Sequence, residues 1–224
     1  MRNNSIHFIH PVDDTTNFLS EILYYLQENT EVDITLFRLK EPEDHTNVLK
    51  SIEQTSDATT IVFMGHGMSS ALSGATVGTY SYGNFISEHA LNVFKGKKVM
   101  LLTCRSNEYL KNYGRESRIS AGIGFPNLVT DSYETLYPEE NADRINGIIE
   151  SDIAQFRILL VNIVKFSLRD FILRDLSFHQ LFTRLKLRSQ KALLEYYRMN
   201  PKRGLIPYGK MLYDLNDGLY YSDC

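Results

Sequence analysis

A histidine and a cysteine that follow two apolar runs are the residues of this sequence best suited to chemistry. His66 follows the run Thr60-Ile-Val-Phe-Met-Gly, and Cys104 follows Val99-Met-Leu-Leu-Thr, 38 positions after the histidine. An imidazole beside a thiol can take up the thiol proton and later return a proton to the leaving group. The two residues therefore predict a cysteine nucleophile with a histidine partner.

The two apolar runs are typical of strands that are buried on both faces of a parallel sheet. Active sites of open α/β sheets lie in the crevice outside the carboxyl ends of the strands. If the two strands are neighbours, His66 and Cys104 meet at one edge of the sheet. Gly67 adds an unhindered backbone N–H beside the histidine.

Strand and helix patterns alternate along the chain up to Cys104. Strands are expected at residues 5–10, 32–39, 59–64 and 99–103, and helices at 16–29, 41–55 and 85–93. Residues 68–87, rich in Ser, Gly, Thr and Tyr, are expected to form a long loop with a small hairpin at 76–82. This alternation predicts the α/β class, with a mostly parallel sheet flanked by helices in three layers.

Helical patterns dominate the chain after Cys104. One or two helical turns at 107–113 and a weaker strand at 120–131 are expected first, then a polar loop at 133–141. Two long helices, at 142–173 and 178–197, and a hairpin at Asn216-Asp-Gly are expected to complete the chain. We interpret residues 1–141 as an α/β core that carries the Cys/His pair. Residues 142–224 form a helical extension with a terminal hairpin, packed on that core as one domain.

Composition and charge argue against several partners and cofactors. A net charge of -3 gives no reason to expect nucleic acid or an anionic membrane as a partner. The N-terminus has no signal-peptide pattern, and Lys165 interrupts the most apolar stretch, 158–164, so we expect a cytoplasmic protein without a membrane span. Two cysteines without a cluster of ligands predict neither a disulfide framework nor a metal site, and no cofactor is expected.

An apolar strand that ends in His-Gly, followed some tens of residues later by an apolar strand that ends in Cys, resembles the caspase-like cysteine peptidases. The resemblance covers residues 5–131 and is strongest to the small bacterial CHAT domains. It implies a caspase-like fold in which Cys104 is the nucleophile and His66 the general acid and base. The backbone N–H groups of Gly67 and Cys104 would bind the oxyanion. It further implies a thiol protease, a bacterial effector that cleaves a companion protein or is regulated by one.

The residues around the cysteine depart from the pattern of true caspases, which carry Gln-Ala-Cys followed by Arg, Gln or Gly and then Gly. In Leu102-Thr-Cys-Arg-Ser106 only the cysteine and the arginine match, so the aspartate specificity of caspases is not implied. Where caspases carry a basic residue after the first strand, this chain has Asp13 and Asp14. An acidic side chain there, aided by Asp131, suits a Lys or Arg before the scissile bond. Helix capping is the ordinary use of such aspartates.

Two other functions remain open from the sequence alone. The first is a catalytically silent α/β interaction module, in which the helical portion binds a partner protein. The second is a nucleotide-handling effector on a flavodoxin-like sheet, with Asp13 and Asp14 near the first strand. The reactivity of the cysteine distinguishes the peptidase from both.

Overall fold

Six strands form the central sheet of the computed structural model, which describes residues 5–57, 59–131, 145, 147–201 and 206–223. In sheet order these are β11 (Tyr220–Asp223), β10 (Ala121–Gly124), β9 (Lys98–Leu102), β3 (Thr60–Met64), β1 (Ile6–Pro11) and β2 (Ile34–Leu39). The edge strand β11 is antiparallel to β10, and the other neighbours are parallel. The predicted α/β class with a mostly parallel sheet is confirmed.

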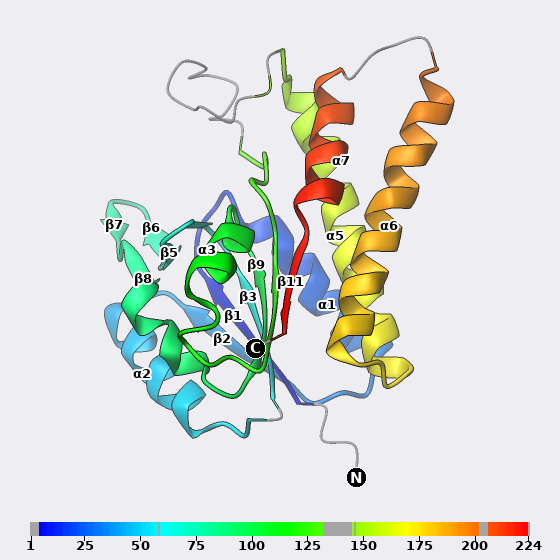
Figure 1. The fold of residues 1–224 in the computed structure, drawn as a ribbon. Coiled ribbons are helices and arrows are strands. Elements are labelled where there is room, and N and C mark those ends of the chain that lie inside the picture. The colour runs from blue at the N-terminus through cyan, green and yellow to red at the C-terminus, as the bar shows by residue number, and fades with distance from the viewer. Residues whose placement is uncertain (1–4, 58, 132–144, 146, 202–205, 224) are drawn as a thin grey trace.

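Helices cover both faces of the sheet (Figure 1). On one face lie α2 (Pro42–Gln54), α3 (Ser106–Tyr113) and the 3-10 helix η2 (Glu88–Phe94). On the other face lie the 3-10 helix η1 (Asn17–Leu19), α1 (Ser20–Asn29), α5 (Glu150–Leu173) and α7 (Pro207–Gly218). The long helix α6 (Phe178–Met199) packs on α5 and α7, on the side away from the sheet.

Each face of the sheet has its own hydrophobic core, and side chains of the central strands alternate between the two. Val62 and Met64 of β3 belong to the core shared with α1, α5, α6 and α7, whereas Ile61 and Phe63 belong to the core under α2 and η2. Burial on both faces explains why β3 and β9 are continuous apolar runs rather than alternating sequences. The helices after residue 149 complete the same core as the sheet.

Two small antiparallel sheets occupy the chain between β3 and η2. One contains β4 (Gly67–Met68), β5 (Ala71–Ser73) and β8 (Asn84–Ser87), and the other pairs β6 (Thr76–Val77) with β7 (Tyr80–Ser81). The pairing of β6 with β7 confirms the predicted hairpin. The predicted helix at 85–93 is wrong at its start, because residues up to Ser87 are held in β8 by pairing with β5.

The predicted terminal hairpin is wrong. Pro207 begins helix α7, and Met211, Leu212 and Leu215 are buried at helical spacing against the core. Proline suits the first turn of a helix because its missing N–H would have no partner there. The Asn216-Asp-Gly signal therefore marks the end of α7, and only the last residues form a strand, β11.

The other elements after Cys104 differ from the prediction mainly in length. The strand predicted at 120–131 is regular only at 121–124, and the chain continues as far as residue 131 without regular structure. The long helix predicted from residue 142 begins at Glu150. The loop predicted at 133–141 lies outside the described residues.

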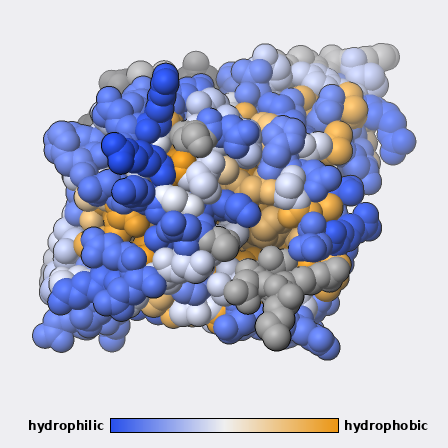
Figure 2. Space-filling view, turned by 60° about the horizontal axis from the view of Figure 1, so that its bottom comes forward, coloured by the Kyte–Doolittle hydropathy of each residue, from blue (hydrophilic) through white to orange (hydrophobic). Residues whose placement is uncertain are grey.

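Hydrophilic residues cover most of the face shown in Figure 2, with smaller hydrophobic patches between them. Within the described part of the chain, no helix combines the length and the hydropathy needed to cross a membrane.

Candidate functional site

The register of two neighbouring strands brings His66 and Cys104 to equivalent positions. Met64 at the end of β3 pairs with Leu102 at the end of β9, and each functional residue follows two positions later. The N–H of Gly65 donates to the carbonyl of Leu102 across 3.3 Å, which extends the pairing beyond the strands. His66 and Cys104 both line one narrow cavity of about 10 Å³, in which a single water molecule would fit.

His66 is held by a threonine and an aspartate from the loop after β1. Thr15 Oγ1 lies 2.6 Å from His66 Nε2 and 2.6 Å from Asp13 Oδ1, and the same carboxylate oxygen lies 3.4 Å from Nε2. Burial raises the pKa of Asp13, but hydrogen bonds from Thr15 and the neighbouring His66 lower it more, so this pKa lies below its ordinary value. Asp13 is therefore ionised at neutral pH.

The charge on Asp13 fixes how the protons of this chain are arranged. An ionised carboxylate only accepts hydrogen bonds, so the single hydroxyl proton of Thr15 is donated to Asp13. The Thr15 oxygen then accepts the proton carried by Nε2 of His66. Nδ1 is consequently the imidazole nitrogen with a lone pair available to accept a proton. A carboxylate that orients the general base, here Asp13 acting on His66 through Thr15, is typical of sites with an activated nucleophile.

Cys104 occupies the tight turn between β9 and α3. The residue after it, Arg105, has a left-handed backbone with φ of 54°, and its N–H donates to the carbonyl of Pro126 across 3.1 Å. This turn leaves Cys104 half-buried just before the N-terminus of α3, where the helix dipole favours a negative charge. The thiol donates a hydrogen bond to the carbonyl of Leu128 across 3.3 Å.

Ser106 fixes the turn through hydrogen bonds of its side chain. Its buried hydroxyl donates to the carbonyl of Leu101 across 2.6 Å and accepts from the N–H of Phe125 across 2.8 Å. The hydroxyl thus joins the carboxyl ends of β9 and β10. Sequence reasoning missed both Ser106 and Thr15. The only sequence signal for the role of Ser106 is its position two residues after Cys104.

Gly67 is required by close packing. A Cβ at this position would collide with Oγ1 of Thr103, the residue before the cysteine. Ser73 N–H donates to the carbonyl of His66 across 3.0 Å, which makes Gly67 and Leu72 a non-hydrogen-bonded pair of the β4–β5 ladder. The N–H of Gly67 therefore points away from β5. The Thr103 side chain lies against the Cα of Gly67.

The three aspartates predicted to bind substrate lie in different settings. Asp13 contacts His66, as described above, and Asp14 beside it is exposed. Asp131 is half-buried and follows Thr130, which lines the cavity shared by His66 and Cys104. Asp13 is thus a partner of the histidine.

A larger pocket lies behind the segment that accepts the thiol hydrogen bond. Residues 127–130 alternate between the two pockets: Leu128 and Thr130 line the cavity with Cys104, while Asn127 and Val129 line this second pocket. Its volume is about 450 Å³. The pocket is therefore separated from the cysteine by one stretch of backbone.

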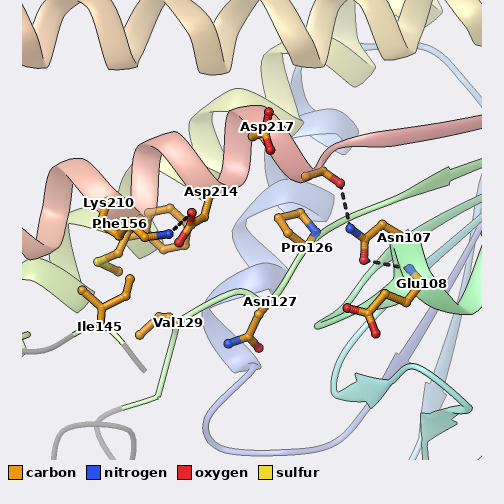
Figure 3. A pocket seen from close by; sticks show the side chains of 12 residues that line it. Asn107, Glu108, Pro126, Asn127, Val129, Ile145, Phe156, Lys210, Asp214 and Asp217 are labelled. Atoms are coloured by element: carbon orange, nitrogen blue, oxygen red, sulfur yellow. Dashed lines mark hydrogen bonds and ion pairs between the residues drawn. The ribbon is translucent and has the colours of Figure 1, made fainter. Parts of the chain in front are cut away.

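Acidic side chains predominate among the charged groups of this pocket (Figure 3). Glu108 from α3 and Asp214 and Asp217 from α7 line it, and Lys210 forms an ion pair with Asp214. Within the described part of the chain, Glu108 and Asp217 have no cationic partner. The pocket thus has an excess of negative charge, which sequence reasoning did not detect because α7 was interpreted as a hairpin.

Among the described residues, no group of three or more His, Cys, Asp or Glu side chains is placed to hold a metal ion. The fold and the site thus define an α/β protein with a cysteine and an oriented histidine at the carboxyl ends of adjacent parallel strands. The chain matches no family model and no curated protein sequence.

Proposed function

We propose that the protein is a cysteine endopeptidase of the caspase-like type that cleaves a companion protein in the cytoplasm. The observation that carries this proposal is the pairing of His66 with Asp13 and Thr15 at the edge where Cys104 lines the same cavity. An oriented base beside a half-buried thiol is the arrangement that nucleophilic catalysis needs. The resemblance of the His-Gly and Cys strand ends to caspase-like peptidases supports the same function.

In the proposed reaction, the thiol proton passes to Nδ1 of His66 as the sulfur attacks the substrate carbonyl. The oxyanion accepts hydrogen bonds from the backbone N–H groups of Gly67 and Cys104. When the C–N bond breaks, His66 gives its proton to the leaving amine, and a thioester remains on Cys104. A water molecule, deprotonated by His66, then attacks the thioester and releases the acid and the thiol.

We propose that peptide binding at Cys104 is accompanied by a rearrangement of the site. The thiol donates to Leu128, and the space that His66 and Cys104 both line is only about 10 Å³. Movement of the segment 126–130 would free the thiol and open the cavity toward the acidic pocket. We propose that a substrate or a regulatory partner protein supplies this movement.

The substrate is proposed to carry a Lys or Arg near the scissile bond. The carboxylates of Glu108 and Asp217 in the neighbouring pocket suit a guanidinium or ammonium group, since they lack a cationic partner within the described residues. Asp14 and Asp131 remain further candidates for the same contact. Asp13 is better suited to positioning His66.

The test is peptide cleavage and thiol alkylation in a Cys224→Ser background, so that one cysteine is measured. We expect Cys104 to react with iodoacetamide faster than free cysteine near neutral pH and the enhancement to disappear in His66→Ala. A peptide library and proteins encoded beside this chain are then incubated with wild type and Cys104→Ala. His89→Ala is the matched control, because its side chain is 91% exposed.

A catalytically silent interaction module is the second candidate, and the hydrogen bond from the Cys104 thiol to Leu128 favours it. A half-buried thiol whose proton is held by a backbone carbonyl is less available to react, as in a structural cysteine. An alkylation rate equal to that of free cysteine, unchanged by companion proteins and by His66→Ala, would exclude the peptidase, and binding of a companion protein without its cleavage would then support the interaction module.

A further inference from the structure

A hollow distinct from the candidate site lies at the opposite end of the sheet from Cys104. It is found where β9 and β10 begin and the antiparallel β11 ends, since Ala121 pairs with both Lys98 and Asp223. Its volume is about 790 Å³. Pockets for small molecules fall in the range of about 300–1,000 Å³. The hollow therefore has the size of a small-molecule site.

Positive charge dominates this hollow. Lys111, Arg115 and Arg118 line it, and no carboxylate of the described residues forms an ion pair with any of the three. Asp223 also lines the hollow and accepts a hydrogen bond from Tyr221 across 3.1 Å, and the Asp57 carboxylate lies beside Gly96 and pairs with Lys97. Among the residues that the structure describes, Lys111, Arg115 and Arg118 thus have no ion-pair partner, and the three cations outnumber the one carboxylate of the lining, Asp223.

The basic side chains are carried by well-fixed backbone. Arg118 has a left-handed conformation with φ of 56°, and its carbonyl accepts from the N–H of Gly96 across 2.8 Å. The Ser120 N–H donates to the carbonyl of Lys97 across 2.9 Å, which fastens the next part of the turn. A non-glycine residue in this conformation costs free energy, and such residues gather at binding sites.

An aromatic ring adds a second kind of surface. The ammonium of Lys111 lies 5.1 Å from the ring centre of Tyr220, which holds the lysine at the wall of the hollow. Guanidinium groups form paired hydrogen bonds with phosphate oxygens, and the Ser120 hydroxyl is a further donor in the lining.

We propose that this hollow binds a small molecule that carries phosphate groups. Arg115 and Arg118 hold the phosphates, and Lys111 and Tyr220 form the adjoining wall. Concentration of three cations in one hollow, rather than along a groove, favours a small polyphosphate over an acidic peptide. The proposal is independent of the peptidase function.

Calorimetric titration of the full chain with inorganic tripolyphosphate and, separately, with ATP tests the proposal. We expect at least one compound to bind, with an affinity that falls as NaCl rises. Tighter binding of ATP would assign a contact to the nucleoside, and equal binding would assign the phosphate chain alone. Arg115→Ala/Arg118→Gly should weaken binding about tenfold or more, equivalent to ~1.4 kcal/mol.

Two features of the chain make the test decisive. Glycine accepts the left-handed backbone of Arg118, so the double variant should fold, and circular dichroism checks that it does. Arg198→Ala, an exposed arginine on α6, is the control and should bind as wild type does. Absence of binding by wild type, undiminished binding by the double variant, or binding of a glutamate-rich peptide instead of both phosphate compounds would overturn the proposal.

Discussion

Thr15 Oγ1 lies 2.6 Å from His66 Nε2, so a hydroxyl from the loop after β1 holds the histidine at the end of β3. The two residues are 51 positions apart in sequence. Their contact links the first strand of the chain to the residue proposed as the base.

Thr15→Val should slow alkylation of Cys104, because His66 loses the oxygen that accepts its Nε2 proton. Loss of the hydrogen bond that links His66 through Thr15 to the Asp13 carboxylate should lower the alkylation rate about tenfold at neutral pH. The rate is measured by mass spectrometry of the peptide that contains Cys104. Ser51→Ala, which removes an exposed hydroxyl on α2, should leave the rate unchanged. Equal alkylation rates in Thr15→Val and wild type would show that Thr15 does not influence the reactivity of Cys104.

Gly67→Ala should destabilise the fold, because its Cβ meets the buried hydroxyl of Thr103. Overpacking of this kind costs about 1–3 kcal/mol, measured as the free energy of unfolding in urea. Combining it with Thr103→Ala should recover much of the loss, since that hydroxyl has no hydrogen-bond partner among the described residues. Gly65→Ala meets only ordinary contacts and is the control. Additive effects of the two substitutions would contradict the steric explanation.

His10 should make the protein acid-sensitive. Burial and the charge of Arg38 lower the pKa of His10 from 6.5 to about 4, and its Nδ1 accepts from Arg38 Nη1 across 2.7 Å. In the unfolded chain His10 is protonated below about pH 6.5, whereas in the folded protein it is protonated only below about pH 4. The free energy of unfolding should therefore fall by up to about 3 kcal/mol as pH decreases through this window.

The pH dependence is checked by urea unfolding at several pH values between about 7 and about 4.5. His10→Asn should flatten the dependence, because an amide oxygen can accept from Arg38 without titrating. His89→Asn changes an exposed ring and should retain the slope of wild type. A slope that survives in His10→Asn would assign the acid sensitivity to another group.

Neutralising the acidic pocket should change the substrate preference of the proposed peptidase. Glu108→Gln/Asp217→Asn is expected to lower kcat/KM about tenfold for peptides with Lys or Arg near the scissile bond, and to leave neutral peptides unaffected. Glu116→Gln, an exposed change outside the pocket, controls for net charge. An equal loss for basic and neutral peptides would indicate a general effect on the fold.

Apolar runs made the central strands predictable. β3 and β9 are buried on both faces, so their sequences show the strand directly, and the pairing of their ends follows from adjacency. This is why His66 and Cys104 could be expected at one edge. The left-handed turn at Arg105 could not be expected, because nothing in its residue type requires it.

The partners of the two residues depended on tertiary contacts that local patterns do not record. Asp13 and Thr15 follow a strand and precede a helix, a position where such residues usually cap. Their contact with His66 depends on the placement of β1 beside β3. The hairpin error at Asn216 had a different cause, since a strong turn signal was preferred over the helical spacing of Met211 and Leu215.

The packing of α3 on β10 has a consequence for divergence among homologues. A Cβ at Gly124 would lie 2.6 Å from the backbone N of Asn107, and one at Gly122 would lie 3.0 Å from Leu110. Gly122 and Gly124 allow α3 to pack closely on β10, whereas Thr15 positions the imidazole of His66. Homologues that lack the cysteine should therefore conserve both glycines but vary at the position of Thr15. This pattern would distinguish residues conserved for the fold from residues conserved for activity.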